Sequence, residues 1–225
     1  TFYTKAADLA GNLSSLSAGS AISIDLTLPN AVTSLVINGT ADAQITKSNT
    51  LALSGVAEAN SRVWLRLDGQ PLNTVMADVS TGAWNFTDTL RVLEDGTHTL
   101  SLQVEDAAGN LGVIRSQVFT VDTVAPLAPV VTRLSAATDS GRSSTDRVTL
   151  NTLPVFEGTA EPGSTVKLYD GATLLGTATE TATAGTFTFT PVSGLTDGVH
   201  SFTVTATDAA GNVSQGSNAF ALTLD

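Results

Sequence analysis

The chain has 225 residues and a formal net charge of −11, and it contains no cysteine. The negative charge disfavours binding to nucleic acid and to anionic membrane surfaces. The lack of cysteine excludes disulfide bonds and thiolate metal sites, but it does not exclude a secreted location. Aromatic residues make up 5% of the chain, while Thr, Ser, Val and Gly are frequent, a composition that favours short strands and turns. No apolar run approaches the ~20 residues that a membrane-spanning helix needs.

A repeated five-residue motif sets the number of domains. Asp-Ala-Ala-Gly-Asn occurs at residues 106–110 and 208–212, and Asp-Leu-Ala-Gly-Asn occurs at residues 8–12. Successive copies lie about 100 residues apart, which is the length of one immunoglobulin-type sandwich. We therefore predict two complete domains, at residues 26–122 and 123–225.

Residues 1–25 are expected to be the last two strands of a further domain that begins before this sequence. The two strands should lie near residues 2–7 and 16–25, on either side of the first motif copy. Two strands alone are marginally stable in water. We therefore expect this segment to pack on a neighbour or to be poorly ordered.

The first complete repeat shows a half-buried strand followed by a tight turn. Residues 63–67 alternate, so Val63, Leu65 and Leu67 should point into the core. Asp68-Gly69 follows directly and is a hairpin turn signal. Further strands of this repeat are expected at residues 51–57, 82–87, 99–105 and 112–121.

The second complete repeat retraces the same path. Residues 155–160 and 166–169 match strands of the first repeat, and Phe187, in a strand at 185–190, takes the place of the expected core residue Trp84. About seven short strands per repeat, separated by turn signals, indicate a Greek-key sandwich. The predicted fold class is all-β, with tandem immunoglobulin-like Greek-key β-sandwiches stacked end to end.

Strand direction predicts where the acidic loops gather. In a Greek-key sandwich the strands run alternately up and down, so the loops after the second and sixth strands lie at the pole that faces the preceding domain. In the second repeat this rule places the loops of Glu161 and Asp208 beside the linker residue Asp122. The matching residues of the first repeat are Asp25, Glu58 and Asp106.

Carboxylates that converge in this way repel one another unless a cation lies between them. Calcium suits flexible, oxygen-rich loops and takes about 6–8 ligands, whereas magnesium requires a tighter octahedral geometry. Backbone carbonyls and a side-chain oxygen of Asn110 or Asn212 would complete the set. We therefore predict a Ca²⁺ site at the junction before each complete repeat. The alternative is that the aspartate and asparagine only cap a tight turn.

A second acidic cluster belongs to the second repeat. Asp139-Ser140-Gly141 is followed by Asp146, in the loop after the first strand and at the opposite pole. The corresponding stretch of the first repeat, residues 38–46, is shorter and keeps only Asp42. A second Ca²⁺ site and a solvated, Ser-rich loop are equally compatible with this pattern.

Neither histidine indicates a catalytic site. His98 and His200 each follow Asp-Gly at the same place in their repeats, as a repeated structural corner would require. No Gly-x-Ser-x-Gly motif accompanies them. Two histidines without nearby partners also make a poor zinc site. We therefore predict that the chain is not an enzyme.

Trp64 is the candidate ligand-binding residue. The alternation of its strand points it outward, with Arg62 and Arg66 on the same face. A tryptophan in this position either stacks on a sugar or covers a cross-strand neighbour, and we favour the second interpretation.

Several motifs of the chain resemble those of bacterial immunoglobulin-like repeats. They are the Asp-Ala-Ala-Gly-Asn loop, Gly-Thr-Ala-Glu-Pro-Gly-Ser at 158–164, Asp197-Gly198 and Asp-Thr-Val-Ala-Pro at 122–126. Such repeats form tandem arrays in giant RTX or SiiE-like adhesins exported by type I secretion. The resemblance covers both complete repeats and the N-terminal remnant, and the stretch from Asp139 to Thr149 matches it too. Residues 25–29 depart from the Asp-Thr-x-x-Pro form of the linker.

The resemblance implies structural spacer repeats of a secreted adhesin on a Gram-negative cell surface, with Ca²⁺ stiffening the junctions and a role in adhesion and virulence. Expected partners are the neighbouring repeats of the same chain, and host cells or glycans would be bound through other domains. We expect a monomer without nucleic-acid binding or membrane insertion. The alternative function is a carbohydrate- or receptor-binding adhesin domain that uses the surface around Trp64. A module appended to an enzyme is a third possibility.

Overall fold

The computed structural model describes residues 2–9, 12–17, 19, 23–140, 142–143 and 145–225. Every regular element in these ranges is a β-strand, and the strands form two sheets in each of two repeats. This confirms the predicted class of tandem immunoglobulin-like sandwiches. No helix with the length and hydropathy of a membrane span occurs in the described ranges.

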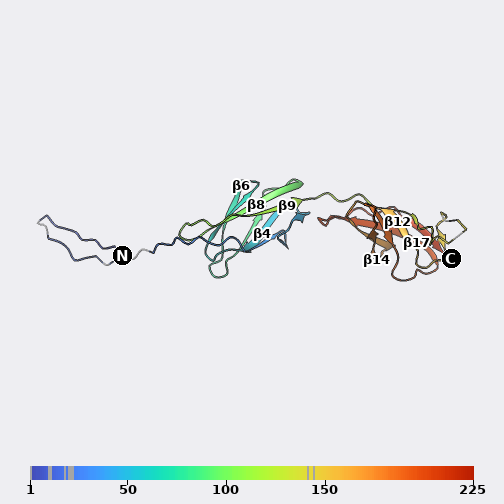
Figure 1. The fold of residues 1–225 in the computed structure, drawn as a ribbon, viewed down its shortest axis with the longest axis horizontal. Coiled ribbons are helices and arrows are strands. Elements are labelled where there is room, and N and C mark those ends of the chain that lie inside the picture. The colour runs from blue at the N-terminus through green and yellow to red at the C-terminus, as the bar shows by residue number, and fades with distance from the viewer. Residues whose placement is uncertain (1, 10–11, 18, 20–22, 141, 144) are drawn as a thin grey trace. The chain divides into compact units, whose positions relative to one another are not determined.

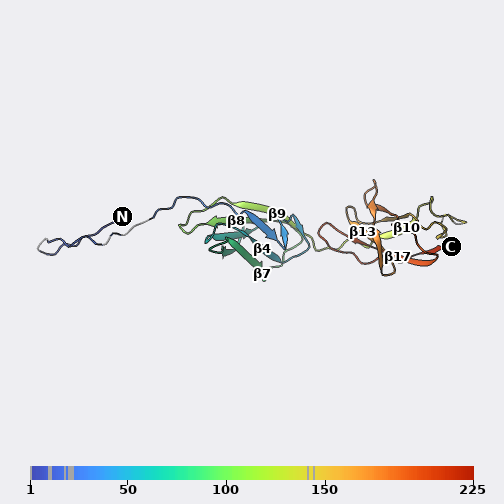
Figure 2. The same ribbon diagram turned by 90° about the horizontal axis from the view of Figure 1, so that it is seen from below.

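The first repeat is a sandwich of two sheets (Figure 1). One sheet has the strand order β2-β1-β4-β7, and the other has the order β3-β9-β8-β5-β6. Figure 2 shows β4 and β7 of the first sheet side by side. The strands are β1 (Ser34–Ile37), β2 (Thr40–Ala41), β3 (Ile45–Thr46), β4 (Leu51–Val56), β5 (Arg62–Leu67), β6 (Gln70–Met76), β7 (Ala83–Asp88), β8 (Gly96–Glu105) and β9 (Arg115–Val121).

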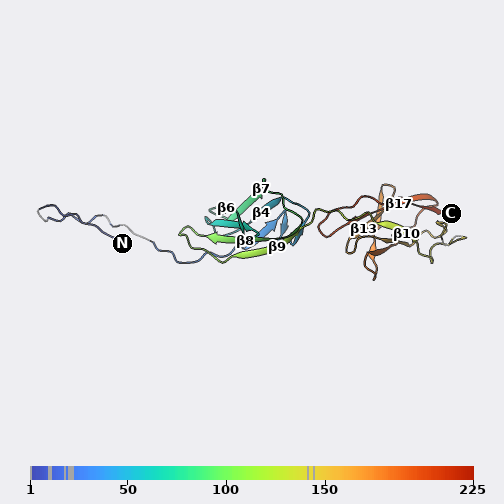
Figure 3. The same cartoon turned by 90° about the horizontal axis from the view of Figure 1, so that it is seen from above.

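The second repeat has the same two-sheet organisation. Its sheets have the strand orders β10-β12-β16-β15 and β11-β18-β17-β13-β14. The adjacent strands β13 and β17 are both visible in Figure 3. The strands are β10 (Val130–Leu134), β11 (Val148–Thr149), β12 (Phe156–Thr159), β13 (Thr165–Asp170), β14 (Thr173–Thr177), β15 (Thr179–Glu180), β16 (Thr186–Phe189), β17 (Gly198–Thr207) and β18 (Phe220–Leu224).

The described part of each repeat has nine strands where about seven were predicted, in part because a short strand follows the loop after the first strand and joins the other sheet. β1 pairs antiparallel with β4, whereas the short β3 pairs parallel with β9 in the other sheet. In the second repeat, β10 pairs antiparallel with β12 in one sheet, and β11 pairs parallel with β18 in the other. The chain therefore crosses from one sheet to the other after its first strand, and in the second repeat the long acidic loop lies at this crossing.

An aromatic side chain packed over a glycine lies in the core of each sandwich. Trp84 is 3% exposed, and a Cβ atom placed on Gly55 would lie 2.7 Å from its Cζ2 atom. Phe187 is also 3% exposed, and a Cβ atom on Gly158 would lie 2.3 Å from its Cζ atom. The glycines let the rings approach the backbone closely. These pairs confirm the predicted equivalence of Trp84 and Phe187.

The predicted hairpin after residues 63–67 is confirmed. Val63, Leu65 and Leu67 are all buried, and exposed residues alternate with them along β5. Asp68 and Gly69 have φ angles of 51° and 75°. Positive φ at both central residues is what a two-residue type I′ turn requires.

The two strands expected within residues 1–25 are not formed where the structure describes this segment. There, Ala7 and Leu13 form an isolated bridge, and the Ser14 backbone N–H donates to the Ala6 carbonyl at 2.8 Å. A two-stranded ribbon without a packed face buries too little apolar surface to hold a longer ladder. Residues 10–11 of the first motif copy, and residues 18 and 20–22 of the second expected strand, lie outside the described residues.

Candidate functional site at the Asp-Ala-Ala-Gly-Asn loops

Each Asp-Ala-Ala-Gly-Asn loop is a tight turn that follows a long strand. The loops follow β8 and β17, and a bridge between Thr207 and Val213 closes the second of them. Gly109 and Gly211 both have a φ angle of 90°. Residues with a Cβ atom rarely adopt this conformation, so the turn itself explains the glycine of the motif.

The aspartate of each loop is held by the asparagine four residues later. In the second repeat, Asn212 donates its backbone N–H to Asp208 Oδ1 at 2.8 Å and its side-chain Nδ2–H to Asp208 Oδ2 at 2.9 Å. In the first repeat, Asn110 donates the same two hydrogen bonds to Asp106, at 2.8 and 2.7 Å.

These hydrogen bonds keep both carboxylates charged. The side-chain hydrogen bond from Asn110 lowers the pKa of Asp106. At Asp208 burial acts to raise the pKa, but the hydrogen bonds from the side chain and backbone of Asn212 outweigh it, and the pKa is lowered. Each loop therefore holds a full negative charge at neutral pH.

The asparagine amide also reaches the segment that leads into its own repeat. Asn212 Nδ2 donates to the backbone oxygen of Asp122 at 2.7 Å, and Asn110 Nδ2 donates to that of Asp25 at 3.1 Å. We call this arrangement of aspartate, asparagine and lead-in carbonyl the Asp–Asn clasp. The clasps are Asp106, Asn110 and Asp25 in the first repeat, and Asp208, Asn212 and Asp122 in the second. Each clasp ties the lead-in segment to the motif loop.

The side chains of the two lead-in aspartates turn to local partners. Asp122 Oδ1 accepts a hydrogen bond from the Val124 backbone N–H at 3.1 Å. Asp25 Oδ1 accepts one from the Thr27 backbone N–H at 2.9 Å. Both aspartates therefore cap the start of their own lead-in segment.

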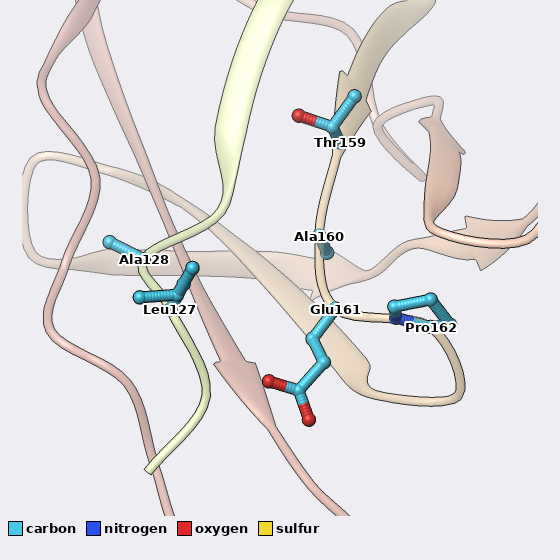
Figure 4. Close-up of a pocket in the computed structure, with 6 residues that line it drawn as sticks. All are labelled: Leu127, Ala128, Thr159, Ala160, Glu161 and Pro162. Carbon is cyan, nitrogen blue, oxygen red and sulfur yellow. The ribbon is translucent and has the colours of Figure 1, made fainter.

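The two predicted glutamate ligands are exposed. Glu161 lines a cavity with Leu127, and its carboxylate lies on the side of the loop that faces this lead-in segment (Figure 4). In the first repeat, Asn60, from the loop of Glu58, lines one cavity together with Asp106. The loops after the second and sixth predicted strands of the first repeat thus lie at the same end of that sandwich.

The donor atoms of the clasps fit a calcium site only in part. Among the described residues, no three His, Cys, Asp or Glu side chains are grouped so that they could hold a metal ion. The asparagine also directs its amide nitrogen, and not its oxygen, at the carboxylate and the lead-in carbonyl. Calcium requires oxygen ligands in such positions. Binding of Ca²⁺ at these two loops therefore stays a prediction.

The second acidic cluster contains one buried and one exposed aspartate. Asp139 is 7% exposed, whereas Asp146 is exposed and accepts a hydrogen bond from the Val148 backbone N–H at 3.1 Å. Both belong to the loop between β10 and β11, as expected, and Gly141 lies outside the described residues. Burial distinguishes Asp139 from the carboxylates of the clasps.

Trp64 contacts its neighbours on β5 and β8. Its indole Nε1 donates to Glu105 Oε2 at 2.8 Å, and the Arg62 guanidinium lies 5.8 Å from its ring centroid. Arg62 also pairs with Glu105 at 3.4 Å. The favoured interpretation, in which Trp64 covers a cross-strand neighbour, agrees with these contacts. Sugar binding at this surface stays a prediction.

The two histidines form equivalent structural corners. The Nε2 atom of His98 lies 2.9 Å from the Glu94 carbonyl oxygen, and that of His200 lies 2.8 Å from the Thr196 carbonyl oxygen. Asp170 is a partner that sequence patterns did not indicate, with its Oδ2 atom 2.6 Å from His200 Nδ1. Both ring nitrogens of His200 thus face acceptors. The hydrogen bond with the Thr196 carbonyl is the largest cause that raises the pKa of His200, and the hydrogen bond with the Asp170 carboxylate is the next.

Replacing His200 by glutamine is expected to lower the free energy of unfolding by about 1–2 kcal/mol at pH 6. The pKa of His200 is raised in the folded chain. Its stabilising effect is therefore fully present below the unfolded pKa of about 6.5, and it is lost as the pH rises through the folded pKa. Urea titrations of wild type and variant at pH 6 and pH 9 measure the difference. An equal effect at both pH values would show that the imidazolium form plays no part.

Comparison with known sequences places both repeats in one family. The family model of the bacterial Ig-like domain matches residues 30–123 and 126–225. Chitinase A1 from Niallia circulans is 34% identical over 157 residues, which cover 64% of this chain and 20% of the chitinase. The chain therefore spans about a fifth of the length of this relative.

Solved structures with a similar fold include the fibronectin(III)-like modules of CbhA from Clostridium thermocellum. They match with a TM-score of 0.54 and 11% identity, over 85% of this chain and 94% of that chain. A Ca²⁺-stabilised adhesin with which an Antarctic bacterium binds ice matches with a TM-score of 0.38 and 24% identity, over 99% of this chain and 55% of that chain. The similarity to CbhA supports the sandwich fold. Because the family match covers both sandwiches, the chain belongs to the bacterial Ig-like domain family and carries two copies of the domain in tandem.

Proposed function

We propose that the chain is a pair of structural spacer repeats from a larger bacterial surface protein of the adhesin class. The observation that carries this proposal is the Asp–Asn clasp, which is built in the same way in both repeats. A lead-in segment tied at its carbonyl oxygen opens less readily than one held by the covalent chain alone. Restricted motion at the start of every repeat is the property that a spacer needs.

We propose the boundaries 26–122 and 123–225 for the two repeats, so that Asp25 and Asp122 are the residues directly before each repeat. The partners of each repeat are then the repeats before and after it in the same chain. In this proposal the parent protein is secreted by a type I system to a Gram-negative surface, and other domains bind the host cell. The chain itself acts without catalysis and as a monomer.

Calcium is the second part of the proposal. The carboxylates of Asp122, Glu161 and Asp208, and those of Asp25, Glu58 and Asp106, would bind Ca²⁺ near the two clasps. Bound calcium would neutralise these charges and add a further tie to each lead-in segment.

Removal of calcium tests this second part. With Ca²⁺ at the loops, a chelator is expected to lower the melting temperature and to increase motion between the repeats, because uncompensated carboxylates repel one another. Calorimetry and small-angle scattering, with Ca²⁺ and with a chelator, measure the two effects. Identical melting and identical scattering in both conditions would rule out calcium as the stiffening agent and would leave the clasp as the proposed device.

The chitinase relative supports a second candidate function, a module that spaces or positions a catalytic domain. The matched region covers 20% of chitinase A1, so most of that protein lies outside it. Under this alternative the chain would bind chitin or lie beside a domain that does. A chitin pull-down of the chain tests direct binding, with Trp64→Ala as the variant for the exposed aromatic surface. If chitin retains the wild-type chain but not Trp64→Ala, the result would favour a carbohydrate-binding role over the spacer role.

A further inference from the structure

The outer face of the five-stranded sheet in the first repeat carries a tryptophan that is fixed in place and still accessible. Trp64 lies on β5 and is 39% exposed. Its indole Nε1 donates to Glu105 Oε2 at 2.8 Å, and the Arg62 guanidinium lies 5.8 Å from its ring centroid. Rotation of the ring would break the hydrogen bond to Glu105. A ring that is ordered before binding loses little conformational entropy when a ligand stacks on it.

Arg66 lies on the same face and lacks an acidic partner. It follows Trp64 by two residues, so the two side chains share one side of the sheet, with Cα atoms about 6–7 Å apart. Its Nη1 donates to the Gly69 carbonyl at 3.5 Å, which is long for a hydrogen bond, and it forms no ion pair among the described residues. Asp68, in the turn after β5, accepts a hydrogen bond from the Thr99 backbone N–H at 2.7 Å. The Arg66 guanidinium can therefore bind a carboxylate through two parallel hydrogen bonds.

The two ends of β5 differ in charge. At one end, Arg62, Met76, Glu105 and Asp106 line part of a cavity of about 380 Å³. The Arg62 guanidinium lies 3.4 Å from Glu105 and neutralises it, so Asp106 makes this end negative, whereas Arg66 makes the other end positive. Salt screens charges further away than about 8 Å, so the net charge of −11 of the whole chain acts only weakly here. A ligand along the strand should therefore be acidic at Arg66 and neutral at the cavity.

The second repeat has the same strand register but other residues on this face. The residues of β13 that match positions 62, 64 and 66 of β5 are Thr165, Lys167 and Tyr169. The sandwich thus forms without an exposed indole beside an arginine, and the fold does not require that pair. Trp64 and Arg66 are a feature that the first repeat adds to the shared scaffold.

We propose that Trp64 and Arg66, which we call the β5 platform, bind an acidic polysaccharide in which a uronic acid alternates with a neutral sugar. The apolar face of the uronate ring stacks on the Trp64 indole, and its carboxylate pairs with Arg66. The neutral sugar next to it lies toward the cavity at Arg62. The β5 platform lies within the first repeat and apart from the clasps, so it goes beyond the proposed spacer function and does not depend on it.

The open form of this face favours internal units of a polysaccharide. β5 lies between β6 and β8 in the sheet, with Thr74 and Gln103 beside Trp64 to meet sugar hydroxyl groups. Small ligands and single sugars are usually enclosed in concave pockets instead. From Arg62 to Arg66 the strand extends about 13 Å, which is longer than one pyranose ring.

The test is a ¹⁵N–¹H NMR titration of the full chain with hyaluronan hexasaccharide, in which glucuronate alternates with N-acetylglucosamine. The indole Nε1–H signal of Trp64 is expected to shift, while that of the buried Trp84 stays in place. Hexagalacturonate carries a carboxylate on every unit, and chitohexaose carries none. Each of them should bind at least about tenfold more weakly, because the first meets Asp106 and the second lacks a partner for Arg66.

Three variants assign the roles of the residues. Arg66→Gln should weaken binding of the hyaluronan hexasaccharide about tenfold and leave that of chitohexaose unchanged, because it removes the charge that the carboxylate requires. Trp64→Ala should abolish the amide shifts of residues 62–66 with every sugar. Lys167→Ala, the matched change in the second repeat, should leave the titration as in wild type. Arg66 is exposed, so Arg66→Gln keeps the test decisive if Trp64→Ala alters the fold.

Several results would overturn the proposal. The absence of a Trp64 shift at about 10 mM hyaluronan hexasaccharide would rule out the site, since even millimolar affinity would be detected. Equal binding of chitohexaose, or unchanged affinity in Arg66→Gln, would rule out the carboxylate. Tighter binding of hexagalacturonate would rule out the alternation, and tighter binding of sialyllactose would show that a terminal sugar is bound. Asp208→Ala should leave the titration unchanged, so failure here would not count against the spacer function.

Discussion

Replacing Gly158 by alanine is expected to unfold the second repeat or to destabilise it by about 3 kcal/mol or more. A Cβ atom at this position would lie 2.3 Å from Phe187 Cζ and 2.3 Å from the Val130 carbonyl oxygen. Neither neighbour has room to move, because Phe187 is buried and Val130 belongs to the β10–β12 ladder. A loss of this size is a large part of the total stability of about 5–15 kcal/mol that is typical of a domain.

Gly55→Ala makes the same change in the first repeat, where the new Cβ atom would lie 2.3 Å from the Ser34 carbonyl oxygen and 2.7 Å from Trp84 Cζ2. Gly216→Ala is the matched control, because a Cβ atom there would have no neighbour within 4 Å. Urea unfolding gives the stability, and amide exchange shows which repeat has opened. A loss below about 1 kcal/mol in Gly158→Ala would mean that the ring and strand repack around the added methyl group.

Replacing Asp208 by alanine is expected to release the clasp of the second repeat and to lower the free energy of unfolding by about 2–3 kcal/mol. The change removes a charged acceptor and leaves the backbone N–H of Asn212 without the bond it makes at 2.8 Å. The amide of Asn212 also loses the carboxylate that orients it toward the Asp122 carbonyl. Amide exchange at residue 212 and limited proteolysis across residues 122–126 should both become faster.

Two other variants separate the clasp from a general effect of charge. Asp197→Ala removes an exposed aspartate of the same repeat and should change stability by less than about 0.5 kcal/mol. Asp106→Ala should loosen the lead-in segment at Asp25 and leave amide exchange at residue 212 as in wild type. If Asp208→Ala and Asp197→Ala had equal effects, the hydrogen bonds of the clasp would contribute nothing measurable to stability.

Local sequence patterns were sufficient to predict the fold. The alternation along residues 63–67 and the Asp68-Gly69 turn depend on residues that are neighbours in the chain, and both are present as predicted. The spacing of the motif predicted two sandwiches, and the family match covers both. The short strands β3 and β11 were missed, because each is defined by its pairing with a strand that lies far along the chain.

The candidate sites were predicted less completely than the fold. Strand direction placed the acidic loops at one pole, but it does not specify which atom of an asparagine faces a carboxylate. The structure shows that the nitrogen of Asn212 faces both Asp208 and the lead-in carbonyl. The partnership of Asp170 with His200 was also missed, since it arises from the pairing of β13 with β17.

The sequence by itself therefore determined the repeat length, the sandwich class and the tight motif turn, because each follows from periodicity or from the φ angle that a glycine permits. The tertiary structure decided which polar groups meet. It shows that the motif forms a hydrogen-bonded clasp, and that the Oδ1 atom of Asp139 is buried without a hydrogen-bond partner among the described residues. The physical reason is that hydrogen-bond partners distant in the chain are brought together by strand register and burial, and neither is encoded in any one local stretch.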